Sequence, residues 1–161
     1  PKKRTENVME IEILRFHCPG LSDGGFFPRD NTGRGKDLSP EIVLENLSPR
    51  ARTLAVTLED LSHPLKGFTH WIMWNFPARE VIPGGLPKYE RLECGAAQGM
   101  AYGIHRYAGP KPPPWSRHRY RLTVYTLDCV LGLSSNARKK HFLKAAEGHI
   151  LQKGCLTAEY G

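Results

Sequence analysis

The run YAGPKPPPWSRHRYRLTVYTL at residues 107–127 decides the fold, because it joins a proline cluster to a regularly alternating segment. Proline donates no hydrogen bond to a sheet ladder, so a central strand cannot pass through residues 110–114. From residue 118 onward the pattern alternates, and one face collects His118, Tyr120, Leu122 and Val124. The stretch therefore predicts a constrained loop followed by a strand over 118–127.

Four other segments predict strands, at 10–16, 53–60, 68–76 and 150–160. In the segment 68–76, strict alternation places Phe68, His70, Ile72, Trp74 and Phe76 on one face. One helix is predicted over 136–147, with Ser134 or Ser135 as its N-cap and Gly148 just after its end. The fold class is therefore mostly β, an antiparallel domain with long loops and one late helix near the C-terminus.

The composition is typical of one globular domain spanning residues 1–161. The chain carries 23 Lys and Arg against 16 Asp and Glu, a net charge of +7, which favours anionic partners without selecting among them. Residues 1–9 are expected to be a flexible basic tail, and without a longer basic stripe no nucleic acid is expected. There is neither an apolar run that could cross a membrane nor a visible secretory signal, so a cytoplasmic location is expected.

Three ionisable side chains fall on otherwise apolar strand faces: Asp60, His70 and His118. A histidine alone on an apolar strand is more often a core residue with a satisfied hydrogen bond than part of a site. Together, beside one Gly- and Pro-rich loop, they favour a shared pocket in which an Asp–His pair orients an imidazole. Two histidines and a tyrosine hydroxyl suit an oxyanion such as phosphate. No standard metal motif, phosphate-binding loop or nucleophile elbow is present, so no metal, cofactor or catalytic residue is predicted.

Several motifs resemble one known family. They are LEDLSHP at 58–64, HW at 70–71, the run at 107–120 quoted above, VYTLD at 124–128 and LKAAEGHIL at 143–151. In this order they are similar to those of the phosphatidylethanolamine-binding proteins, in particular the short prokaryotic branch often called Raf-kinase-inhibitor-like. The resemblance covers nearly the whole chain.

The resemblance implies a large antiparallel sheet flanked by a smaller one, with a shallow anion site at one end. The family's site motifs fall here on Asp60, His70, Gly109, Pro110, Pro112, His118 and Tyr120. Ser62, His63 and Lys111 are expected at the rim, where Ser62 replaces an acidic residue of the family pattern. The resemblance also implies a cis peptide bond between His63 and Pro64.

Three functions stay open at this point. The first is a non-catalytic module that binds phosphate, a phosphorylated headgroup or a carboxylate, with donors from the histidines, Tyr120 and the backbone N–H groups around Gly109. Its affinity is expected to rise as pH falls through about 6.5. The second is a regulator, an inhibitor of a kinase or protease, that reads an acidic or phosphorylated protein through the same pocket. The third is a small hydrolase using Asp60 and His70 as an acid/base pair. Formation of a homodimer is left open.

Overall fold

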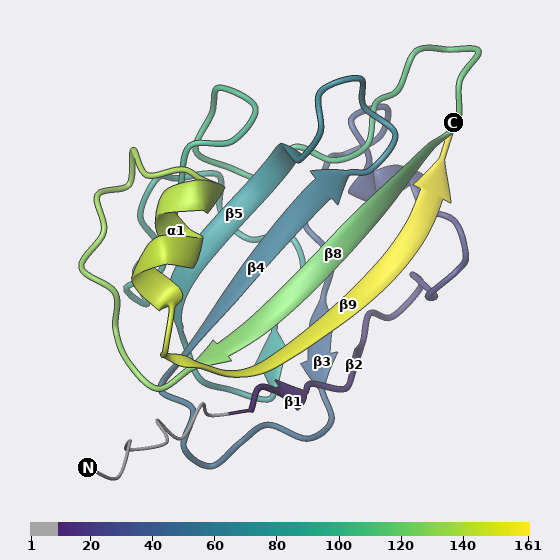
Figure 1. Cartoon of the computed structure of the whole chain (residues 1–161). Helices are drawn as coiled ribbons and strands as arrows, with labels where there is room; N and C mark the ends of the chain where they lie inside the picture. Colours follow the sequence, from purple (N-terminus) through teal and green to yellow (C-terminus); the bar gives the residue numbers. More distant parts are fainter. Residues whose placement is uncertain (1–9) are drawn as a thin grey trace, which may run out of the picture.

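Two sheets form the frame of the computed structural model, which describes residues 10–161. The predicted basic tail, at 1–9, lies outside the described residues. The larger sheet has six strands in the order β1-β9-β8-β4-β5-β7, and the smaller has three in the order β2-β3-β6 (Figure 1). The larger sheet consists of β1 (Glu12–Ile13), β9 (Ile150–Tyr160), β8 (His118–Leu127), β4 (Thr53–Asp60), β5 (Phe68–Pro77) and β7 (Ala97–Gln98); the smaller consists of β2 (Phe16–His17), β3 (Ile42–Leu44) and β6 (Val81–Ile82).

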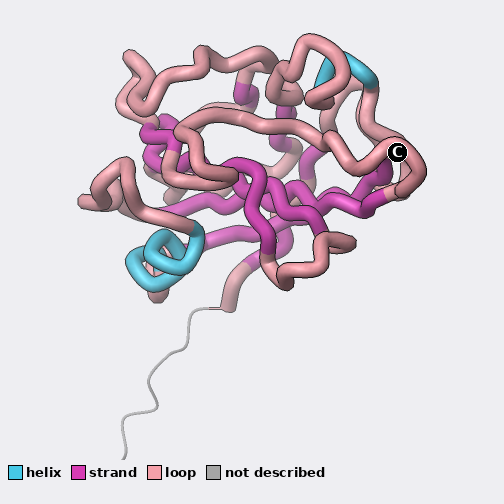
Figure 2. The backbone as a smooth tube through the Cα atoms, turned by 90° about the horizontal axis from the view of Figure 1, so that it is seen from above, coloured by secondary structure: helices cyan, strands magenta, loops and turns pink. Residues whose placement is uncertain are grey.

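The four long strands lie where the sequence pattern predicts them, but the first segment does not form one strand. Residues 10–16 divide between β1 and β2, which join different sheets. Strand β1 runs parallel to β9, with Glu12 opposite Gln152, so the larger sheet is mixed and not purely antiparallel. Figure 2, seen from above, shows that loops make up most of the layer around the strands.

The larger sheet is buried on both faces, which makes it the middle layer of the domain. One face packs against the smaller sheet through residues such as Val56, Trp71 and Ile82. The other face packs against the helix α1 (Lys139–Ala146) through residues such as Trp74 and Phe142. All eight residues of β4 are buried, as expected for a central strand covered on both sides.

Strand β5 departs from strict alternation at two irregularities. Leu58 lies opposite Trp71 but Glu59 lies opposite Thr69, so His70 is an extra residue in the ladder. A second irregularity lies at Asn75, whose backbone has φ 60 and whose side chain exchanges two hydrogen bonds with Leu131. The prediction that the even-numbered residues of 68–76 all share one face is therefore wrong, because each bulge shifts the following residues to the other face.

Helix α1 begins three residues later than predicted. Ser134 accepts a hydrogen bond from the backbone N–H of Asn136, but this closes a separate turn before the helix. At the helix start, the His141 ring accepts a hydrogen bond from the Arg138 N–H at 3.0 Å. Gly148 adopts φ +78 after the helix end, as predicted. No helix within residues 10–161 has the length and apolar character needed to cross a membrane.

A buried carboxylate ties the helix to the sheet, and this gives a first testable expectation. Glu59 is 4% exposed and lies 2.6 Å from Lys139 and 3.8 Å from Arg121. Replacing Lys139 with Met should lower the free energy of unfolding by about 2 kcal/mol, because it leaves a buried charge with one distant partner. Arg121→Met should cost under about 1 kcal/mol, since Arg121 is more exposed. Urea unfolding checks both, and a Glu59→Gln/Lys139→Met double variant that fails to recover stability would contradict this explanation.

Candidate functional site

An Asp–His pair lies at the junction of β4 and β8. Asp60 ends β4, and Tyr120 is directly opposite it in the ladder with β8. His118, two residues before Tyr120, places its Nδ1 atom 2.7 Å from Oδ2 of Asp60. The other carboxylate oxygen accepts the N–H of Ser62 at 2.8 Å. Because an ionised carboxylate can only accept, His118 carries its hydrogen on Nδ1 and has Nε2 left for a ligand.

His70 lies beside this pair and is itself buried, with 4% of its surface exposed. Its Nδ1 atom is 2.9 Å from the carbonyl oxygen of Ala108, so Nδ1 donates and Nε2 again is left unprotonated in the neutral ring. The ring packs edge-on against Tyr120, with 5.5 Å between centroids. Burial lowers the pKa of His70, against the opposing effects of the Ala108 carbonyl and Asp60. The bulge at His70 turns this side chain toward Tyr120, whose ring also contacts His118.

The proline-rich loop contacts His70 through the carbonyl of Ala108 and is clamped to the loop that contains the 3-10 helix η1 (Arg29–Asn31). The hydroxyl of Tyr107 donates to Asn31 at 2.6 Å, and the N–H of Gly33 donates to the carbonyl of Pro110 at 2.9 Å. The N–H of Gly109 donates to Asp37 at 2.7 Å. The expectation that this N–H would serve a ligand is therefore wrong. A Cβ added to Gly109 would lie 2.2 Å from the Asn31 carbonyl, so this glycine permits the close loop contact.

Arg34, in the loop that contains η1, was not predicted as a site residue from the sequence. Its guanidinium donates to the carbonyl of Pro112 and lies over the ring of Tyr160, 5.7 Å from the centroid. Burial, followed by Asp60, raises the pKa of Tyr120, and the charge of Arg34 acts in the opposite direction. Arg34 thus brings a permanent positive charge to the hydroxyl end of Tyr120. Its position between Gly33 and Gly35 was the one available signal, since glycines allow two loops to approach closely.

The three residues predicted at the rim lie in different surroundings. Ser62 is exposed, and its hydroxyl accepts the N–H of Arg119 at 2.9 Å. His63 stacks on Phe68 with 3.9 Å between ring centroids. Lys111 is exposed, while its neighbours Pro110 and Pro112 are buried.

The peptide bond before Pro64 is not cis: no cis bond occurs anywhere in residues 10–161, so that prediction is wrong. The trans form is the more stable by about 0.5–1 kcal/mol for an X–Pro bond. Here the turn is instead shaped by the His63 ring, which accepts the N–H of Leu65 at 3.0 Å.

An open groove of about 690 Å³ lies beside His70 but is not lined by Asp60, His70 or His118. It shares an aromatic edge with the pocket, because Tyr102 packs against both Phe68 and His70. Its walls come from the turn before β5, the loop after β7 and the start of α1. Four basic side chains line it: Lys66, Arg138, Lys139 and Lys140. Its residues are scattered over the sequence, so no local pattern predicted it.

The lowered pKa of His70 makes stability depend on pH in a definite direction. Protonation is harder in the folded state than in the unfolded chain, whose ordinary value is 6.5, so stability is full above that pH and falls below it. We expect the free energy of unfolding to decrease between pH 6.5 and 5, with His70 contributing at most about 1.4 kcal/mol per pH unit. His70→Asn should reduce this slope and the exposed His17→Asn should not. Urea titrations at pH 7, 6 and 5 measure it; equal slopes in wild type and His70→Asn would contradict the assignment.

Comparison with known proteins gives a consistent result. The family model described as phosphatidylethanolamine-binding protein matches residues 19–161. A UPF0098 protein of Pyrococcus abyssi is 40% identical over 139 residues, covering 84% of this chain and 78% of the relative. A UPF0098 protein of Methanothermobacter thermautotrophicus is 35% identical over 149 residues, covering 91% and 97%. A crystal structure from Chlamydia trachomatis, named as a putative homologue of the same family, superposes with a TM-score of 0.81 at 26% identity, covering 93% of this chain and 98% of that one. The superposition confirms the two-sheet fold that the resemblance implied.

Proposed function

The chain belongs to the phosphatidylethanolamine-binding protein family, and from its site we propose that it is a non-catalytic module that binds a small phosphorylated or carboxylated group between His118, His70 and Tyr120. The observation that carries the proposal is the fixed orientation of the two imidazoles. Each has its Nδ1 held by the protein, His118 by Asp60 and His70 by Ala108. Both Nε2 atoms are therefore left for a ligand, that of His118 as a donor when its ring is protonated and that of the neutral His70 ring as an acceptor.

The Asp60 carboxylate makes binding depend on protonation. A neutral imidazole that donates through Nδ1 can only accept at Nε2, so it cannot donate to an anion there. When His118 is protonated, Nε2 becomes a charged donor, and the imidazolium also neutralises Asp60, 2.7 Å away. Arg34 adds a second cation whose charge acts on the Tyr120 hydroxyl. An oxyanion is thus bound more tightly at lower pH.

The aromatic edge formed by Phe68 and Tyr102 is evidence for a ligand larger than the anion alone. Phe68 and Tyr102 separate the pocket from the groove of about 690 Å³, and Tyr102 is 53% exposed. An organic substituent on the bound group would lie along this edge. Inorganic phosphate and a phosphorylated headgroup share the same anion chemistry, and a comparison of the two distinguishes them.

A second candidate function, regulation of a kinase or protease, is favoured by one surface feature. Trp115 is 88% exposed in the proline-rich loop, which contacts His70 through Ala108. An exposed tryptophan beside an anion pocket suits recognition of an acidic or phosphorylated side chain on a protein. In that case the anion would be a residue of the partner and affinity for the free ion would be low.

Isothermal calorimetry with sulfate tests the proposal. Sulfate keeps its charge between pH 6 and 8, so any change in affinity with pH comes from the protein and not from protonation of the ligand. We expect sulfate to bind at least about fivefold more tightly at pH 6 than at pH 8, because protonated His118 donates from Nε2. His118→Ala should remove this pH dependence and weaken binding about tenfold. His17→Ala is the matched control, since His17 also pairs with a carboxylate, Glu45, at 3.0 Å on the exposed surface.

Two further measurements identify the source of the anion. Phosphoethanolamine binding more tightly than phosphate, together with sedimentation on vesicles that contain phosphatidylethanolamine, would assign a lipid headgroup. Equal affinity for both ions would assign the free anion. Absence of any saturable heat with all of these ligands at millimolar concentration would reject the anion pocket.

A further inference from the structure

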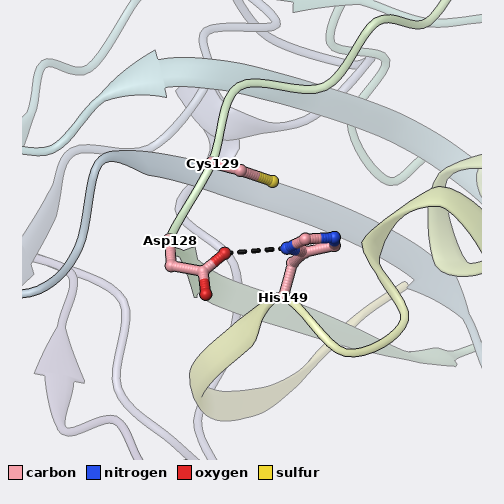
Figure 3. A group of neighbouring side chains, drawn as sticks. All are labelled: Asp128, Cys129 and His149. Carbon is pink, nitrogen blue, oxygen red and sulfur yellow. Dashed lines mark hydrogen bonds and ion pairs between the residues drawn. The ribbon is translucent and has the colours of Figure 1, made fainter.

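A cluster of three side chains with metal-binding atoms lies at the opposite end of the larger sheet from the anion pocket. It consists of Asp128, Cys129 and His149, whose potential ligand atoms all lie within 4.8 Å of one another (Figure 3). Within residues 10–161 no other group of three or more such side chains meets this criterion. Strand β8, which separates the cluster from His118, spans roughly 30 Å. The cluster is therefore independent of the proposed function.

The sheet ladder holds the three residues in place. Asp128 and Cys129 directly follow β8, and His149 directly precedes β9, its antiparallel neighbour. The N–H of Asp128 donates to the carbonyl of His149 at 3.1 Å. The hydroxyl of Thr53, in β4, donates to the carbonyl of Cys129 at 2.7 Å. Both backbone segments are thus fixed before any ion binds, which reduces the entropy cost of assembling the site.

The polar contacts within the cluster are those that a cation can replace. Nδ1 of His149 lies 2.8 Å from Oδ1 of Asp128, so the pair shares one hydrogen. The thiol sulfur of Cys129 lies within 4.8 Å of the ligand atoms of both partners. A divalent cation stabilises a thiolate and displaces the hydrogens of the thiol and of the Asp–His pair. Asp128 and His149 are 30% and 47% exposed, which gives an ion a route from solvent.

We propose that Asp128, Cys129 and His149 bind a Zn²⁺ ion, with water in the fourth position. A thiolate, an imidazole nitrogen and a carboxylate oxygen are each accepted zinc ligands, and the sulfur disfavours Mg²⁺ and Ca²⁺. Zinc bond lengths of 2.0–2.3 Å place tetrahedral ligand atoms roughly 3.3–3.6 Å apart. The Asp128 and His149 atoms, now 2.8 Å apart, must therefore separate slightly, and any pair near the 4.8 Å limit must close by about 1 Å.

No metal site was predicted from the sequence, because the sequence contains no standard metal-binding motif. The reason is topological: the cysteine and the histidine lie 20 positions apart in the chain and meet only because β8 and β9 pair. Local spacing carries no signal for such a site.

Cobalt substitution tests the proposal directly, since Co²⁺ occupies zinc sites and is coloured. Titration of the full chain under a reductant that does not bind metal should give visible d–d bands and a near-ultraviolet thiolate-to-cobalt band, which Zn²⁺ then displaces. Cys129→Ser should abolish the thiolate band, and His149→Gln should weaken Zn²⁺ binding at least about tenfold. Cys94→Ser, at an exposed cysteine outside the cluster, and His17→Ala should leave the spectra unchanged.

Thermal unfolding gives a readout that does not depend on the variants. Saturating Zn²⁺ should raise the Tm of the wild type by several degrees, and a chelator should reverse the rise. Absence of the thiolate band in the wild type, or its persistence in Cys129→Ser, would overturn the proposal. Equal loss of the band in Cys94→Ser would do the same, because it would indicate unspecific binding by exposed thiols. None of these outcomes bears on the anion pocket, which the sulfate titration tests separately.

Discussion

Replacing Trp71 with alanine is expected to lower the free energy of unfolding by about 3–5 kcal/mol, the largest stability effect that we anticipate. Trp71 is completely buried between the two sheets, and its ring packs edge-on against Tyr107. Its indole N–H donates to the side chain of Gln98 at 2.8 Å, and Gln98 is itself buried. The truncation therefore creates a cavity and also leaves a buried acceptor without its partner.

Trp115 is the matched control for this variant, since the same truncation at a side chain that is 88% exposed should change stability by less than about 0.5 kcal/mol. Trp71→Phe, which keeps an aromatic ring but loses the hydrogen bond, should lie between the two. Urea denaturation followed by circular dichroism measures all three. A cost for Trp71→Ala no larger than that for Trp115→Ala would show that this core is misassigned.

Removing the charge of Arg34 is expected to have the largest effect on ligand affinity. Arg34→Met should weaken sulfate binding about 10- to 100-fold, because a hydrogen bond to a charged group contributes roughly 1.5–3 kcal/mol. The guanidinium is partly buried against Tyr160 and Pro112, so solvent screens it less than a surface lysine.

Lys36→Met removes the same charge from an exposed position in the same loop and should change the affinity less than about twofold. Arg34→Lys separates charge from loop support, because a lysine keeps the charge and loses the planar contact with the ring. We expect it to recover part of the affinity in calorimetry. Equal affinities for Arg34→Met and Lys36→Met would place Arg34 outside the binding site.

The long strands could be predicted from the sequence because their signal is local. Strands β8 and β9 begin and end at the residues that alternation indicates, and β4 does as well. The irregularities of β5 could not be predicted in this way, since each depends on the partner strand. At Asn75 the deciding contacts are with Leu131, which is 56 positions away.

The same distinction applies to the candidate site. The motifs indicated Asp60, His70, His118 and Tyr120, and the structure brings these four side chains together. Arg34 and the N–H of Gly109 were misjudged because their roles depend on how two distant loops pack. The N–H of Gly109 is used by Asp37, 72 positions away, and that contact leaves no trace in either local sequence. The ligand-binding roles of these four residues, of Pro110 and Pro112 and of the rim residues stay predictions, as do the expected cytoplasmic location and the absence of nucleic-acid binding.

The most direct test of the central claim follows the ring signals of the seven histidines by NMR while sulfate, phosphate and then phosphoethanolamine are added. If the pocket binds anions, the signals of His118 and His70 shift saturably, and those of His17 and His149, outside the pocket, do not. In His70→Ala the saturable shift of His118 should be strongly reduced. If His118 and His70 do not respond at millimolar ligand, or respond no more than His17, these imidazoles do not form an anion site and the search for function turns to protein partners of the loop that carries Trp115.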